Sequence, residues 1–123
     1  MWLQPLSACL CAVVATLAMG VLASPGASAH SQLEDSNPRS GDRVNGIVRS
    51  ITLSFNEDVT SPRVVLRGPK GKTFRISTRH RGGSTVVSRI TPALTPGAYN
   101  VLWRVRSADG HWISGVMGFS VVK

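Results

Sequence analysis

The sequence predicts an all-β domain, an immunoglobulin-like sandwich, on two observations. Short runs of alternating apolar and polar residues recur after residue 29, with turn residues between them. No helical periodicity interrupts them. These runs indicate about seven strands, the number found in an immunoglobulin-like sandwich.

The first predicted strands cover residues 51–55, 64–66, 73–78 and 84–90. In the first of them, apolar residues alternate with Thr52 and Ser54, which is typical of a strand with one buried face. Gly68-Pro69-Lys70-Gly71 and Gly82-Gly83 supply turns between these strands.

Two further strands are predicted over residues 99–105 and 117–121. Their alternation places the aromatic residues on the buried face, which argues against a ligand-binding role for them. We expect a core built from Phe55, Tyr99, Val101, Trp103 or its in-phase neighbours, and Phe119.

Residues 1–29 are predicted to be a cleaved signal peptide. An apolar run from Leu10 to Ala23 precedes Ala27-Ser28-Ala29, the small-residue pattern that signal peptidase accepts. The n-region lacks Lys and Arg, but the apolar run is shorter than the ~20 residues of a membrane anchor. A lipoprotein site at Cys9 is disfavoured because the apolar run follows that cysteine. Cleavage after Ala29 would leave a mature domain of residues 30–123.

The composition of the mature domain limits its ligands and partners. Both cysteines, Cys9 and Cys11, precede residue 30, so a metal site would need nitrogen and oxygen ligands apart from the thioether of Met117. All charged residues follow residue 29, and the net charge of +8 is compatible with weak contact to an anionic membrane or wall surface. We favour the simpler interpretation that these charges form a solvated surface. We expect no nucleic-acid partner, because the protein is exported and shows no RNP-like motif or Cys/His finger.

His30 would be the first residue of the mature protein. Its α-amine and its ring Nδ1 could then chelate one metal ion. An α-amine has an ordinary pKa of about 7.7–8.0, so a metal can displace its proton near neutral pH.

Asp109-Gly110-His111 is the second candidate. A spacing of two places both side chains on one side of an extended segment. With the amine and ring of His30 they make a set of three nitrogens and one carboxylate oxygen, which suits Cu(II). Taken alone, Asp-Gly-His is more typical of a plain turn in which Asp109 bonds backbone amides and His111 faces water. His80 lies between Arg79 and Arg81, which would repel a cation, so we interpret it as a surface histidine.

The mature sequence resembles the CopC family of bacterial periplasmic copper-binding proteins. The resemblance begins at His30, includes Leu53-Ser54-Phe55, and is strongest over residues 97–111, which read GAYNVLWRVRSADGH. It implies a Greek-key β-sandwich in which His30, Asp109 and His111 bind Cu(II). It also implies an inner-membrane copper transporter as a partner.

Two departures from the family are visible. Some members carry a methionine-rich Cu(I) site, whereas the mature chain keeps only Met117, which is in phase with Phe119 and Val121. We therefore expect Met117 in the core and no Cu(I) site. Trp112 stands where the family often has proline, and its role is left open.

Three functions compete. The first is a non-catalytic Cu(II) carrier or store for copper homeostasis and resistance. The second is a polysaccharide monooxygenase-like oxidase, which also uses an N-terminal copper histidine; a carboxylate from Asp109 on the metal opposes that chemistry. The third is a metal-free sandwich that binds anionic surfaces. Copper titration would distinguish the metal-free sandwich from the two copper proteins. Oxygen consumption in the presence of a reductant would then distinguish the carrier from the oxidase.

Overall fold

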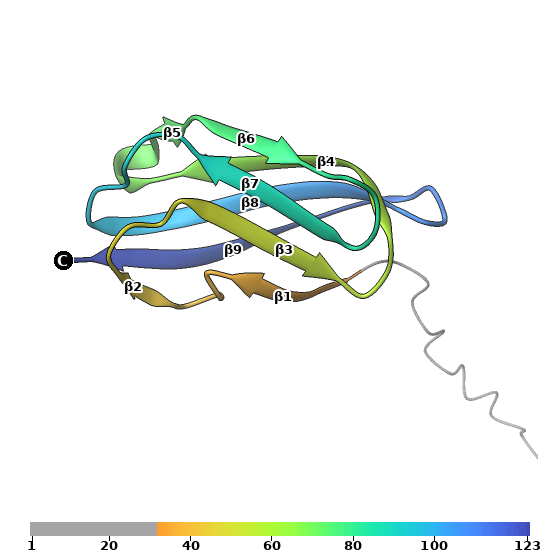
Figure 1. The fold of residues 1–123 in the computed structure, drawn as a ribbon, viewed down its shortest axis with the longest axis horizontal. Coiled ribbons are helices and arrows are strands. Elements are labelled where there is room, and N and C mark those ends of the chain that lie inside the picture. The colour runs from red at the N-terminus through yellow and green to blue at the C-terminus, as the bar shows by residue number, and fades with distance from the viewer. Residues whose placement is uncertain (1–31) are drawn as a thin grey trace, which may run out of the picture.

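The computed structural model describes residues 32–123, so the predicted signal peptide and His30 lie outside the described residues. This part of the chain forms a sandwich of two β-sheets (Figure 1). One sheet contains, in spatial order, β1 (Leu33–Asn37), β3 (Ser50–Phe55), β7 (Thr85–Ile90) and β6 (Ile76–Arg79). The other contains β2 (Arg43–Asn45), β9 (Trp112–Val122), β8 (Gly97–Ser107), β4 (Val59–Arg67) and β5 (Thr73–Phe74). No helix within residues 32–123 is long and apolar enough to cross a membrane.

The predicted all-β sandwich is confirmed, although the described residues form nine strands where the sequence suggested about seven. One reason is the segment 73–78, which was predicted as a single strand. Its first part, β5, pairs with β4, and β6 pairs with β7 in the opposite sheet, with Arg75 at the crossing. Local alternation cannot reveal such a crossing, because each half keeps a strand-like pattern.

The core fills the space between the two sheets. All the residues predicted to form it are buried except Trp103, which is partly buried against it. Val101 and Val105 flank Trp103 in phase on β8 and are fully buried. Met117 is also buried, as its phase with Phe119 predicted.

Trp103 packs against a strand position that has no side chain. Its ring lies edge-on to Phe55, with 5.2 Å between the centroids, and Gly115 is its partner on β9. A Cβ at Gly115 would lie 2.4 Å from Trp103 Cζ2, closer than real carbon atoms approach. The buried indole Nε1 has no hydrogen-bond partner within the described residues, so packing alone fixes this ring.

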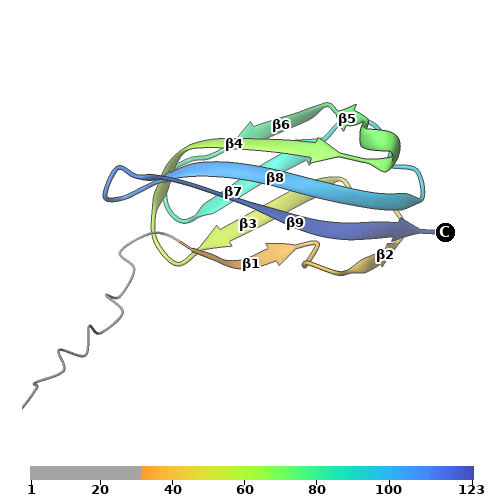
Figure 2. The same cartoon turned by 180° about the vertical axis from the view of Figure 1, so that it is seen from behind.

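Several loops and the start of the described chain meet at one end of the sandwich. The β8–β9 turn, the β6–β7 turn and the beginning of β1 lie at the same end in both views (Figures 1 and 2). Gln32 is fixed there by Asn56, which follows β3: Gln32 N donates to Asn56 Oδ1 at 2.6 Å, and Asn56 N donates to Gln32 O at 3.0 Å. The residue two positions after His30 is therefore tied to the end that carries Asp109 and His111.

Gly115→Ala is expected to destabilise the domain by about 1–3 kcal/mol, because the added Cβ displaces Trp103 from its site against Phe55. The measurement is urea unfolding followed by tryptophan fluorescence. Val116→Ala, at an exposed position of the same strand, is the control and should change stability by less than about 0.5 kcal/mol. Equal effects of the two substitutions would show that the close approach does not constrain the core.

Candidate metal centre

The β8–β9 turn has the geometry of a tight hairpin. Gly110 N donates to Ser107 O at 2.9 Å, and Ser107 N donates to His111 O at 2.8 Å. Gly110 has φ 89°, the left-handed conformation that favours glycine. A turn closed by a left-handed residue is a common three-residue hairpin connection, which explains why Gly110 follows Asp109.

Asp109 is the polar centre of this turn. Its Oδ1 accepts hydrogen bonds from the hydroxyl of Ser107 and from the backbone N–H of His111, the latter at 3.1 Å. Its Oδ2 lies 2.9 Å from Nδ1 of His111. The structure therefore brings the two described ligand candidates into direct contact.

The local geometry predicted for Asp109 and His111 was wrong. A spacing of two was expected to align the side chains along an extended segment, but Asp109 and His111 lie in a turn. They meet because the left-handed Gly110 reverses the backbone between them. The bond from His111 N to Asp109 is also the one expected of a plain Asp-Gly turn, so this turn alone does not identify a metal site.

The hydrogen bonds keep the carboxyl group of Asp109 ionised. The Ser107 hydroxyl has the largest effect, followed by the His111 side chain and backbone, and together they hold the pKa of Asp109 well below its ordinary value. Asp109 therefore offers an anionic oxygen at every pH near neutrality. Sequence reasoning missed Ser107, although a serine two residues before an aspartate is a recognisable turn signal.

The contact with Asp109 determines which nitrogen His111 can offer. A carboxylate only accepts, so Nδ1 of His111 carries the proton in this contact and Nε2 is the nitrogen suited to a metal. A histidine whose other N–H donates to a carboxylate is a common arrangement at metal centres. The His111 side chain is well exposed, with 69% of its surface accessible.

No group of three His, Cys, Asp or Glu side chains suited to a metal occurs within residues 32–123. The predicted third member, His30, lies outside the described residues. Gln32 is nevertheless fixed at this end of the sandwich, and two residues of extended chain reach about 7 Å.

His80 has a structural role that the sequence did not predict. Its Nε2 lies 2.6 Å from Val59 O and its Nδ1 lies 3.0 Å from Thr85 O, so the half-buried ring links β4 of one sheet to β7 of the other. The interpretation of His80 as a surface histidine was therefore wrong, because both ring nitrogens contact backbone carbonyls between the sheets.

Trp112 begins β9 directly after His111 and is exposed. The guanidinium carbon of Arg104 lies 4.5 Å from the centroid of its ring, a cation–π contact. The side chain thus packs beside the turn on the outer face of the five-stranded sheet.

The family model of the CopC domain matches residues 33–122, almost the whole described chain. The chain belongs to the CopC family. It is 32% identical to copper resistance protein C of Pseudomonas syringae pv. tomato over 120 residues, which cover 88% of this chain and 93% of that protein. It is also 32% identical to protein YobA of Escherichia coli K12 over 105 residues, or 81% of this chain and 85% of that protein.

Two solved structures of the CopC type share the fold. CopC from Methylosinus trichosporium OB3b has a TM-score of 0.68 and 27% identity, covering 75% of this chain and 93% of that one. PcoC, a methionine-rich copper resistance protein from Escherichia coli, has a TM-score of 0.64 and 26% identity, covering 76% of this chain and 99% of that one. Unlike a methionine-rich protein, this chain has three methionines, and Met117 is buried in the core.

Ser107→Ala is expected to raise the pKa of Asp109 towards its ordinary value of about 3.9, because it removes the strongest of the bonds that stabilise the carboxylate. The measurement is an NMR titration of the Asp109 carboxyl carbon. Ser114→Ala, on β9 and away from the turn contacts described for Asp109, is the matched control and should leave this titration unchanged. An unchanged pKa in Ser107→Ala would contradict a dominant role for the serine hydroxyl.

Proposed function

We propose that this CopC-family protein binds one Cu(II) ion through His30, Asp109 and His111 and so carries or sequesters copper outside the cytoplasm. The observation that carries the proposal is the direct contact between Asp109 and His111 in the β8–β9 turn. Relatives named as copper resistance proteins support copper as the metal.

The donor chemistry favours Cu(II). The mature chain has no cysteine, and its one methionine is buried, so soft sulfur ligands for Cu(I) are not available at this turn. Imidazole and amine nitrogens with one carboxylate favour Cu(II), which also binds most tightly among the divalent first-row metals. The anionic Asp109 offsets part of the ion's charge in a chain with a net charge of +8.

Two arrangements of Asp109 are compatible with this chemistry. In one, Asp109 keeps its contact with Nδ1 of His111 and orients the ring so that Nε2 binds copper. In the other, the carboxylate itself binds the ion. Both place a negative charge beside the metal, and the second is the role that the family resemblance implies.

The proposal includes processing and export. Cleavage after Ala29 frees the α-amine of His30, and the mature protein would then act in the periplasm or a wall space. An inner-membrane copper transporter is the proposed protein partner. We propose no catalytic role, because a carboxylate at the copper centre opposes oxygen activation at an open position.

The processed protein is expected to bind one Cu(II) far more tightly than Zn(II). His111→Ala should weaken binding, and one extra residue before His30 should weaken it more, because it removes both the amine and its chelate ring. The measurement is competitive titration against a chelator of known strength, with electron paramagnetic resonance, after mass spectrometry has established the N-terminus.

His80→Ala is the control for these variants. It removes an imidazole whose nitrogens contact backbone carbonyls, so copper affinity should not change while circular dichroism reports the fold. An N-terminally extended protein that binds copper as tightly as the processed one would show that His30 is not the N-terminal chelate.

Copper affinity is expected to fall as the pH is lowered from about 8 to about 5, because protons compete for the amine and the imidazoles. The carboxyl of Asp109 stays ionised over this range, since its pKa is lowered; its charge is lost only in stronger acid. Asp109→Asn should therefore reduce affinity by a similar factor at each pH, measured by the same titration. If the copper affinity of Asp109→Asn approached that of the unsubstituted protein towards pH 5, this role of Asp109 would be contradicted.

A further inference from the structure

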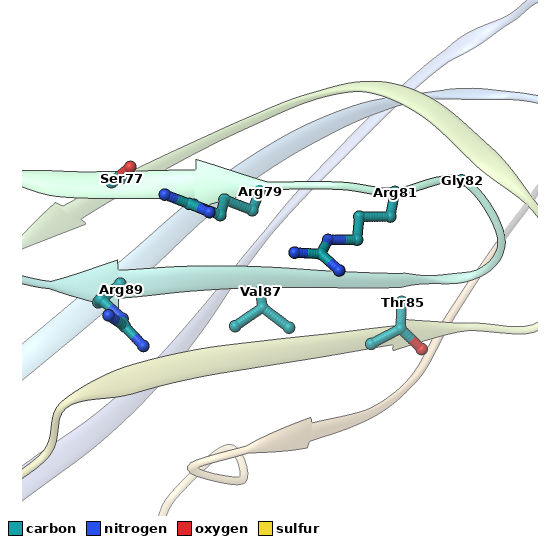
Figure 3. Close-up of a pocket in the computed structure, with 7 residues that line it drawn as sticks. All are labelled: Ser77, Arg79, Arg81, Gly82, Thr85, Val87 and Arg89. Carbon is teal, nitrogen blue, oxygen red and sulfur yellow. The ribbon is translucent and has the colours of Figure 1, made fainter.

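A second charged feature lies on the outer face of the four-stranded sheet. A hollow of about 460 Å³ lies over β6 and β7 and is lined by Ser77, Arg79, Arg81, Gly82, Thr85, Val87 and Arg89. Figure 3 shows the guanidinium groups of Arg79 and Arg81 extending from the β6 side of the hollow. On β7, Val87 lies between Arg89 and Thr85. Its volume falls within the ~300–1,000 Å³ of small-molecule sites.

Strand alternation explains why these side chains gather there. On β7, Val86, Ser88 and Ile90 face the core, so Thr85, Val87 and Arg89 face outward. Arg89 pairs with Ser77 and Val87 pairs with Arg79 on the neighbouring strand. Arg79 and Arg89 are thus diagonal neighbours, with Cβ atoms about 7–8 Å apart.

The three arginines have no carboxylate partner within residues 32–123. No ion pair of the described chain includes Arg79, Arg81 or Arg89. The next strand, β3, places the hydroxyl residues Ser50, Thr52 and Ser54 opposite the outward positions of β7.

Beyond β3, the strand β1 carries Glu34 and, opposite Ser54, Asp35. Asp35 already pairs with Arg39, with 3.3 Å between Nε and Oδ1. No ion pair within residues 32–123 offsets the charge of the three arginines, so they repel one another, and a bound polyanion would relieve that repulsion.

We propose that this hollow binds a soluble anion that carries two or more phosphoryl groups, of the diphosphate class. A guanidinium group donates a fork of N–H bonds that matches phosphate oxygens, and the hydroxyls of Ser77 and Thr85 can donate beside it. One carboxylate offers one charge and two oxygens, too few for three arginines. A concave site between two strands suits a small molecule better than a flat membrane.

This site is separate from the proposed copper centre. Arg79 and Arg89 lie on β6 and β7 of the four-stranded sheet, and Arg81 lies in the turn between these strands, whereas Asp109 and His111 lie in the β8–β9 turn of the five-stranded sheet. Three arginines repel a free cation, so the two sites would take ligands of opposite charge. Copper binding should therefore be unaffected when the arginines are replaced.

The test is isothermal titration of the protein, produced from the full chain, with inorganic pyrophosphate at about 0.15 M salt. The double variant Arg79→Gln/Arg89→Gln should weaken binding about tenfold or more, because it removes two charge-assisted contacts. Arg63→Gln/Arg67→Gln is the matched control: it removes the same charge from β4, in the other sheet, and should weaken binding less than about threefold. Circular dichroism should report the same fold for both variants, since none of the four side chains belongs to the buried core.

Two results would overturn the proposal. One is equal weakening by the two double variants, which would show that only net charge attracts the anion. The other is an absence of pyrophosphate binding. The proposal also fails if pyrophosphate does not bind but vesicles of anionic phospholipid, unlike neutral vesicles, bind through Arg79 and Arg89.

Discussion

The long pairing of β8 with β9 is the constraint on which the rest of this structure depends. The two strands pair without a register shift from Gly97 and Val121 at one end to Arg106 and Trp112 at the other. This ladder carries a large part of the core on its inner face and ends in the turn that holds Asp109 and His111. A slip of one residue would exchange buried and exposed faces and would also move the turn residues.

The core and the turn are therefore coupled through strand register. Close packing of Trp103 over Gly115 admits no side chain at that position, which specifies how the two strands align. The same alignment places Ser107 opposite His111, with a backbone hydrogen bond between them. Ser107 then reaches Asp109 with its hydroxyl, so packing several residues away helps to set the charge state of the candidate ligand.

Contacts between the sheets bring the remaining parts of this end together. His80 joins the backbones of β4 and β7, and Val59 N donates to Gly83 O at 3.1 Å beside it. Gln32 is held by Asn56 at the same end. The proposed copper centre and the arginine hollow thus lie on different sheets of one fold, and they would bind ligands of opposite charge.

The sequence by itself determined the sandwich and most of its core, and it singled out Asp109 and His111 as candidate ligands. Alternation of apolar residues along a strand is a local property, so the pattern alone assigns Tyr99, Val101 and Phe119 to the buried face. Only the tertiary structure decided that residues 73–78 are shared between the two sheets, that His80 joins them, and that Arg79 and Arg89 face one hollow. These features depend on which strands become neighbours, and strand pairing joins residues far apart in the chain, which no local pattern records.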